Sequence, residues 1–306
     1  MGEQQRSTPA RIGVTALNLI GPGLGLVRVA GLRAAIWLIA GPTVILLSVI
    51  LLGRLAPRPN FTAFVIAMTL VIVASIALYI YAIVRTWRAS RSKSASSFWS
   101  RWYGLVLIVL VTIAADNLAV QVYHGIYRPF YILAESMLPT LAVNDRIFVD
   151  MRGGHAPVRG DLILFNAPGG AMYIKRVAAL AGDRIEMRAG VPIVNGKPPF
   201  LKNMGDTAYE NGPAHIRQEQ LAGETGTHLI WDLDETAIDY MPERIVPAGH
   251  VFVLGDNRDR SADSRLSRTE LGVEMLPESD ITGTPLFIYW SNDRAKIGKS
   301  LIAPNK

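Results

Sequence analysis

FTAFVIAMTLVIVASIALYIYAIV, residues 61–84, contains no charged side chain over 24 consecutive positions. A helix needs about 20 apolar residues to cross a bilayer core, so this stretch predicts a membrane span. The preceding stretch, AAIWLIAGPTVILLSVILLG at residues 34–53, is equally uncharged. Only RLAPRPN, with its two prolines, separates the stretches, which predicts a helical hairpin.

A third apolar stretch, residues 104–123, contains one acid, Asp116. Ionisable residues inside membrane spans are rare and are usually paired or functional. We expect Asp116 to pair with an arginine of the first segment or to lie near a wet interface. Residues 14–27, VTALNLIGPGLGLV, are too short and too interrupted by glycine and proline to span. They predict an interfacial or re-entrant element within a cytoplasmic or interfacial segment, residues 1–33, ahead of a three-helix anchor, residues 34–127.

Charge is distributed unevenly along the chain. Residues 1–127 contain 11 Lys and Arg against two acids, whereas residues 128–306 contain 20 against 23. Five of these cations and no acid lie at residues 85–103, so the positive-inside rule places this loop and the N-terminus in the cytoplasm. The chain after the third span is then outside. Arg54 and Arg58 in the outer loop weaken the rule slightly. Because the cations flank apolar segments, a topology signal explains them better than nucleic-acid binding.

The rest of the chain, residues 128–306, has the pattern of a β-rich domain. Short apolar or alternating runs are separated by Gly, Pro and Asp turns, and none has helix length. VNGKPPF at residues 194–200 contains the Asn-Gly pair of a tight hairpin turn. Strands are predicted at RIFVD (146–150), DLILFNA (161–167), MYIKRVAAL (172–180), RIEMRAG (184–190), HVFVLGD (250–256) and ITGTPLFIYW (281–290).

Within this domain, residues 206–243 contain nine acids against one arginine. They predict an excursion from the main sheet, a solvated hairpin or subdomain. We interpret these acids as a solvent-exposed face rather than a metal site, because their densest stretch, DLDET at residues 232–236, lacks the glycine and the distal glutamate of a calcium loop. The chain contains no cysteine, which excludes disulfides, thiolate catalysis and cysteine metal sites.

AESMLPTL, residues 134–141, presents Ser136 on a segment that Pro139 makes stiff. A stiff turn suits a hydroxyl that must be aimed, and it also suits an ordinary surface turn. A serine nucleophile needs a base to take its proton. None of the histidines lies in a recognisable catalytic setting; they are at positions 124, 155, 215, 228 and 250.

A lysine is the other candidate base. In AMYIKRVAAL, strand alternation puts Lys175 on one face and Arg176 on the other, so one cation must face the more buried side. Burial lowers the pKa of a lysine and makes it a usable base. The periodicity fits equally well with a lysine on an edge strand that extends its amine into solvent and has no catalytic role. GDNRDRSADSR, residues 255–265, predicts an interlocked turn with local ion pairs, and its Ser261 is able to orient a neutral lysine amine.

SMLPTL, RGDLILF, YIKRVAALAGD and GDNRDRSADSR, in this order, resemble bacterial type I signal peptidase, a membrane-anchored serine–lysine endopeptidase. The resemblance covers residues 129 to about 290. It implies a mostly-β catalytic domain on the outer face of the bacterial inner membrane. It also implies that the partners are the lipid bilayer and preprotein signal peptides, cleaved after small residues in an Ala-X-Ala-like pattern. We expect no metal, no other cofactor and no nucleic acid.

The resemblance assigns a role to each candidate residue. Ser136 is the nucleophile and an oxyanion donor through its backbone N–H, Lys175 is the general base, and Ser261 orients the lysine. Ion-pair residues that shape the site are Asp256, Arg258, Asp263, Arg265 and Arg176. The shallow apolar substrate pockets correspond to Phe130, Ile132, Leu133, Ala134, Met137, Leu141 and Ile174.

Three features depart from the family pattern. Ala134 stands where many relatives have Ser or Gly, Arg260 replaces a common asparagine, and three spans exceed the usual one or two. A catalytically inactive membrane scaffold is therefore an alternative, supported only by Ala134. A self-cleaving serine–lysine protein of the repressor type is disfavoured by the spans. A transporter leaves the second half of the chain unexplained.

Overall fold

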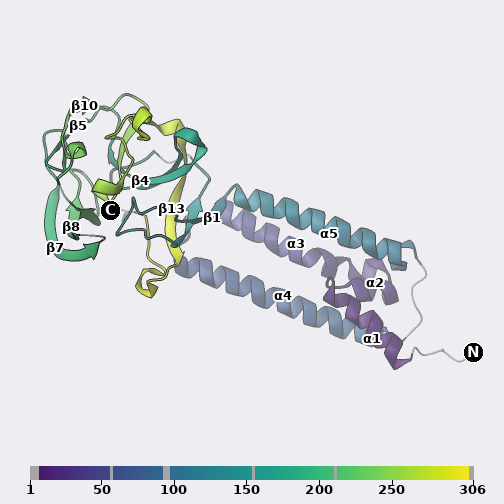
Figure 1. Cartoon of the computed structure of the whole chain (residues 1–306). Coiled ribbons are helices and arrows are strands. Elements are labelled where there is room, and N and C mark those ends of the chain that lie inside the picture. Colours follow the sequence, from purple (N-terminus) through teal and green to yellow (C-terminus); the bar gives the residue numbers. More distant parts are fainter. Residues whose placement is uncertain are drawn as a thin grey trace, which may run out of the picture. The chain divides into compact units, whose positions relative to one another are not determined.

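The structure, a computed structural model, describes residues 7–55, 58–91, 97–153, 156–209, 212–233 and 235–302. They form two compact units, Met1–Ile126 and Tyr127–Lys306, whose elements are labelled in Figure 1. Two residues considered above, His155 and Asp234, lie outside the described residues.

The first unit is helical. Three helices in it are long and apolar enough to cross a membrane: α3 (Leu32–Leu55), α4 (Phe61–Ala89) and α5 (Trp102–His124). They coincide with the three predicted spans and extend most of their ends by a few residues. Asn60 caps α4, because its side chain accepts a hydrogen bond from the Ala63 N–H at 2.8 Å. The short 3₁₀ helix η2 (Phe98–Ser100) precedes α5.

The apolar stretch at residues 14–27 forms short helices and their connection. α1 (Thr8–Ala16) continues into the 3₁₀ turn η1 (Leu17–Leu19), and α2 (Leu24–Ala30) follows. Leu26 and Val27 of α2 are buried in one cluster with apolar side chains of α3, α4 and α5. Gly25 permits this packing, since a Cβ there would lie 2.4 Å from the Val14 carbonyl oxygen. This segment therefore helps to hold the long helices together.

Asp116 of α5 does not pair with an arginine. Its Oδ1 accepts a hydrogen bond from the Thr43 hydroxyl of α3 at 2.6 Å, and Asp116 forms no ion pair within the described part of the chain. The arginine partner, one of the two expectations for Asp116, was therefore wrong, and its placement near a wet interface stays a prediction. A hydroxyl satisfies one lone pair of the carboxyl group and links two spans.

The second unit is mostly β, as predicted. Its largest sheet has seven strands, all paired antiparallel, in the order β1-β2-β13-β3-β4-β11-β12. The strands are β1 (Tyr127–Tyr131), β2 (Arg146–Asp150), β3 (Leu162–Asn166), β4 (Met172–Ala179), β11 (His250–Leu254), β12 (Leu276–Pro277) and β13 (Ile281–Trp290). Five of the six predicted strands are in this sheet.

Two smaller sheets complete the unit. One has the order β10-β5-β6, and the other β7-β8-β9. Their strands are β5 (Arg184–Arg188), β6 (Val191–Val194), β7 (Phe200–Tyr209), β8 (Gly212–Gln220), β9 (His228–Asp232) and β10 (Met241–Ile245). Short 3₁₀ helices are η3 (Pro168–Gly170), η4 (Ala237–Asp239), η5 (Arg258–Arg260), η6 (Arg268–Glu270), η7 (Glu278–Asp280) and η8 (Arg294–Lys296).

The Asn-Gly turn has the geometry that its sequence predicts. Asn195 and Gly196 have φ of 53° and 73°, and Val194 and Lys197 bridge across them. The acidic excursion also differs from the main sheet, since most of its described residues belong to the sheet β7-β8-β9. Its acids are not all solvated, however. Glu219 and Glu224 are buried, so the interpretation of a solvent-exposed face is wrong for them.

Two buried clusters lie against alternate side chains of the central strands. One cluster includes Leu162 and Leu164 of β3 with Ile174 of β4 packed against it. The other includes Ile163 of β3 and Val177 of β4. Alternation along β3 and β4 therefore gives two apolar faces, because a separate buried cluster packs against each of them.

Candidate active site

The turn that carries Ser136 connects β1 to β2. Its neighbours Met137 and Leu141 are buried in the core, which anchors the turn and leaves Ser136 half-buried. The loop after β11 also holds it. The Asn257 backbone N–H donates to the Ser136 carbonyl oxygen at 3.1 Å, and the Asn257 side chain donates to the Glu135 carbonyl oxygen at 3.2 Å.

Lys175 lies on β4 and is only 2% exposed. Its Nζ donates a hydrogen bond to the Ser136 Oγ at 2.6 Å. Burial lowers the pKa of Lys175 to about 8, against the opposing attraction of the Asp263 carboxylate. Lys175 therefore contacts the Ser136 hydroxyl, and its amine binds a proton much less tightly than the amine of a solvated lysine.

Both cations of β4 are buried, which the periodicity did not decide. β4 pairs with β3 on one side and β11 on the other, so the reading of an edge strand is wrong. Arg176 binds Asp256 with two hydrogen bonds of 2.8 and 2.6 Å. Burial opposes ionisation of Asp256, but the charge and hydrogen bonds of Arg176, together with His228 and the Thr140 hydroxyl, outweigh it and lower the pKa of Asp256. Thr140, four residues after Ser136, also donates to Asp256.

The loop GDNRDRSADSR is only partly self-contained. Its Arg265 binds Asp263 at 2.9 and 3.0 Å, and the Asp263 carboxylate also accepts the Gly255 N–H at 3.0 Å. Asp256 instead pairs with β4. Arg258 donates to the Glu219 carboxylate of β8. The expected local ion pair is therefore present for Asp263 and Arg265, but wrong for Asp256, which pairs with Arg176. Arg258 forms its ion pair outside the loop.

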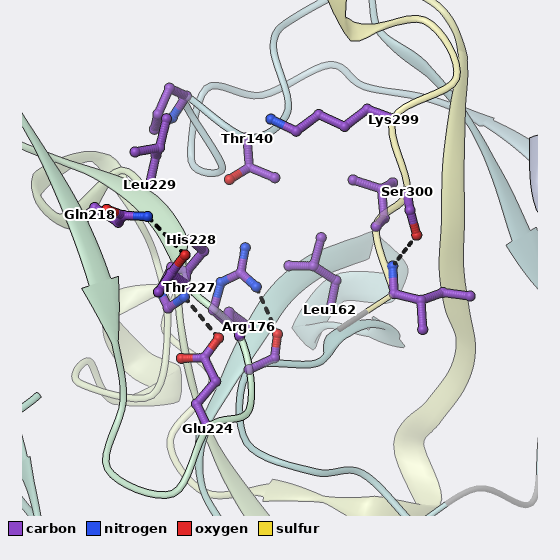
Figure 2. A pocket seen from close by; sticks show the side chains of 15 residues that line it. Thr140, Leu162, Arg176, Gln218, Glu224, Thr227, His228, Leu229, Lys299 and Ser300 are labelled. Carbon is purple, nitrogen blue, oxygen red and sulfur yellow. Dashed lines mark hydrogen bonds and ion pairs between the residues drawn. The ribbon is translucent and has the colours of Figure 1, made fainter. Parts of the chain in front are cut away.

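Glu219 and its neighbours form a buried polar cluster that the sequence analysis did not identify. His228 contacts Glu219 and Glu224 at 3.0 Å through its two ring nitrogens, and Figure 2 shows the contact with Glu224 beside Arg176. Burial opposes ionisation of Glu219, but Arg258 and His228 outweigh it and lower its pKa to about 2. Glu219, Glu224 and His228 lie close together in the sequence, but Arg258 comes from the loop after β11, 39 residues from Glu219, so no short motif marked the cluster.

Ser261 lies close to the turn that carries Ser136, but among the described residues it forms no hydrogen bond with Lys175. Its Oγ is buried and has no hydrogen-bond partner among the described residues. Gly255 lies between the two serines. A Cβ at Gly255 would lie 2.2 Å from the Ser261 Oγ and 2.5 Å from the Ser136 carbonyl oxygen, so only glycine allows this approach.

An apolar cavity of about 420 Å³ opens onto Ser136 and Lys175. All seven residues proposed for the substrate pockets line it: Phe130, Ile132, Leu133, Ala134, Met137, Leu141 and Ile174. The sequence analysis missed part of the wall, namely Tyr131, Leu164, Ala171, Met172, Tyr173, Arg260 and Ala262. β4 and the loop after β11 contribute four of these. Across the described residues, no group of three or more His, Asp or Glu side chains has the arrangement of a metal site.

The chain matches the family model described as signal peptidase, peptidase S26, over residues 99–290. It is 31% identical to signal peptidase I U of Bacillus subtilis strain 168 over 194 residues, covering 61% of this chain and 87% of the relative. It is 33% identical to signal peptidase I of Pseudomonas aeruginosa PAO1 over 188 residues, covering 54% and 65%. A crystal structure of a signal peptidase I from Enterococcus faecalis V583 matches with a TM-score of 0.26 and 23% identity, covering 43% of this chain and 98% of that one.

The family match extends from η2, just before the third apolar helix, to the end of β13 and so includes every candidate catalytic residue. Because it spans more than half of the 306 residues, the chain belongs to the signal peptidase family, peptidase S26.

Proposed function

We propose that this protein is a membrane-bound endopeptidase that removes signal peptides from exported preproteins, with Ser136 as nucleophile and Lys175 as general base. The observation that carries the proposal is the 2.6 Å contact between the Lys175 Nζ and the Ser136 Oγ. The lysine is buried, and its pKa of about 8 leaves about one molecule in ten neutral at pH 7. A neutral amine has the lone pair that a base needs.

In the proposed mechanism, neutral Lys175 takes the proton of the Ser136 hydroxyl while the Oγ attacks the carbonyl carbon of the scissile peptide bond. The resulting ammonium then gives this proton to the departing amine, which leaves an acyl ester on Ser136. A water molecule, deprotonated by the same lysine, hydrolyses the ester. The Ser136 N–H donates to the oxyanion, and exposed Ala134 offers no side-chain donor.

The surrounding polar residues serve to hold this pair in place. Ser261 orients the amine of Lys175; its buried hydroxyl has no hydrogen-bond partner among the described residues and is therefore available for this role. Asp263 and Arg265 neutralise each other beside the lysine. Arg176 and Asp256 join β4 to the loop after β11, and Thr140 ties the nucleophile turn to the same carboxylate.

The apolar cavity supports the proposed preference for small side chains in an Ala-X-Ala-like pattern. Its wall is formed by aliphatic and aromatic groups that leave about 420 Å³ beside Ser136. Small apolar side chains fill such a space without burying an unpaired polar group. The same wall excludes water from Lys175 and keeps its amine poorly solvated.

We also propose that the peptidase unit lies outside the cytoplasmic membrane of a bacterium. The basic loop between α4 and α5 supports a cytoplasmic position for that loop. α5 ends at His124 and β1 begins at Tyr127, so the peptidase unit starts within three residues of the last span. A reporter fused at residue 95 should be cytoplasmic, and reporters fused at residues 57 or 210 external. An external reporter at 95 contradicts this topology.

The cleavage test uses the full-length protein purified in detergent with a preprotein substrate. Wild type should release the mature protein, and Ser136→Ala and Lys175→Ala should each remove nearly all cleavage, because the two side chains act as one unit. Lys197→Ala, at an exposed lysine, is the matched control. More than about a tenth of the wild-type rate in Lys175→Ala contradicts the lysine base. Absence of cleavage by wild type indicates the scaffold, and fragmentation of the enzyme alone indicates self-cleavage.

A further inference from the structure

A second apolar cavity, of about 370 Å³, lies in the helical unit between α3 and α5, two helices that run side by side in Figure 1. Leu32, Ile36 and Thr43 of α3 are among its lining residues, and Val111 and Ala115 of α5 face them. We call this cavity the α3/α5 groove. It belongs to helices long and apolar enough to span a membrane, so its natural surroundings are lipid.

The lining offers almost nothing to a polar ligand. Of the twelve lining residues only two carry a hydroxyl, and both hydroxyls are already donors. Thr43 donates to Asp116 at 2.6 Å, and Thr112 donates to the Ile108 carbonyl oxygen at 2.5 Å. A polar group placed in the groove would lose its hydrogen bonds to water without replacement. The occupant must therefore be hydrocarbon over most of its length.

The length of the groove matches one leaflet of a bilayer. Its lining on α3 runs from Leu32 to Val44, twelve residues apart, which is about 18 Å of helix. Half of a bilayer core of about 30 Å is about 15 Å. α3 and α5 both begin at the same end, where α2 contacts η2 through a hydrogen bond from Arg28 to the Ser100 carbonyl oxygen. Trp99 of η2 lines this end.

The end where both helices begin is cationic. Arg33 lies in the first turn of α3, Arg101 directly precedes α5, and both are exposed. Arg28 lies beside them on α2. The acid on these helices, Asp116, is about 22 Å further along α5 from Arg101 and is held by Thr43. A ligand that fits both features has an apolar chain and an anionic head.

We propose that the α3/α5 groove binds an anionic phospholipid of the surrounding bilayer, with an acyl chain between the helices and the phosphate at Arg33 and Arg101. Basic pockets between spans on the cytoplasmic side suit such head groups, and Trp99 and Trp102 lie at the level where indole rings prefer to sit. In the proposed topology this is the inner leaflet.

Two other apolar occupants fit less well. A helix is about 10 Å across, so only one of its faces fits into the α3/α5 groove, whereas a single hydrocarbon chain enters it whole. A signal peptide, moreover, carries positive charge ahead of its apolar segment. That charge would face Arg33 and Arg101 when its apolar segment lay along α3 in the same orientation. A single acyl chain meets neither obstacle.

The test measures lipid retention by native mass spectrometry of the full-length protein in detergent, with phosphatidylglycerol or phosphatidylcholine of identical chains. Wild type should retain one phosphatidylglycerol at least about tenfold better than phosphatidylcholine. Arg33→Gln and Arg101→Gln should each reduce this preference about fivefold, the fold-change of about 1 kcal/mol per basic residue. Arg88→Gln, in the last turn of α4, is the matched control and should change nothing.

A second pair of variants tests the groove itself. Ala40→Phe and Ala115→Phe place a ring in it and should abolish retention, and a melting curve in the same detergent identifies a variant that does not fold. Equal retention of the two lipids overturns the proposal, as does full retention in a folded ring variant. Displacement of the lipid by glycerol phosphate at equal concentration would show that the chain plays no part. The result is separate from peptidase activity, because Ser136→Ala should retain the same lipid.

Discussion

Replacing Lys175 by methionine should abolish cleavage and at the same time stabilise the protein. Burial lowers the pKa of this lysine from 10.5 to about 8. The unfolded chain therefore binds the proton more tightly than the native state, so native stability rises between about pH 8 and pH 10.5 and is lowest below pH 8. The difference of about 2.5 pK units corresponds to about 3 kcal/mol. Methionine is similar in length and uncharged, and it removes this cost.

Two measurements on the same variant check this reasoning. Chemical unfolding at pH 7 should give a free energy of unfolding up to about 3 kcal/mol higher for Lys175→Met than for wild type, with a smaller gain at pH 10. Lys197→Met, at an exposed position, should change neither stability nor rate. For wild type, kcat/KM should rise about tenfold per pH unit below about pH 8 and then level. A less stable Lys175→Met, or a rate independent of pH between 6 and 9, refutes the reasoning.

Three further substitutions have defined outcomes. Gly255→Ala puts a methyl group 2.5 Å from the Ser136 carbonyl oxygen and should lower kcat at least about a hundredfold, with about 1–3 kcal/mol of lost stability; near-normal kcat shows that the turn adapts. Glu219→Ala leaves Arg258 buried without its partner and should cost about 3–5 kcal/mol in denaturant unfolding at pH 7. In wild type, the contribution of Glu219 should persist above its ordinary pKa of 4.5 and disappear as the pH falls towards 2; an acid-insensitive unfolding curve over this range contradicts it. Ala134→Ser adds an oxyanion donor and should raise kcat with little change in KM; a tenfold fall at unchanged stability means that the site requires the small side chain.

The sequence alone determined the two-part architecture. Long uncharged runs have few other uses than crossing a bilayer, and the strands of the second unit are short apolar segments between strong turn residues. The predictions of Ser136 and Lys175 as a pair also came from local blocks, through their resemblance to a family. These features are local in the chain, so the residue types and their spacing carry them.

Only the tertiary structure decided which charges meet. Arg176 with Asp256, Arg258 with Glu219, and the Asn257 contacts to the Ser136 turn join segments up to about 120 residues apart. The two faces of β4 were undecided for the same reason, because burial of both depends on segments distant in the sequence that pack against each face. Asp116 likewise met a hydroxyl of another span where an arginine was expected. A sequence states which groups ionise, but the partner and the depth of burial, which set the pKa of Lys175, follow from how the strands pair.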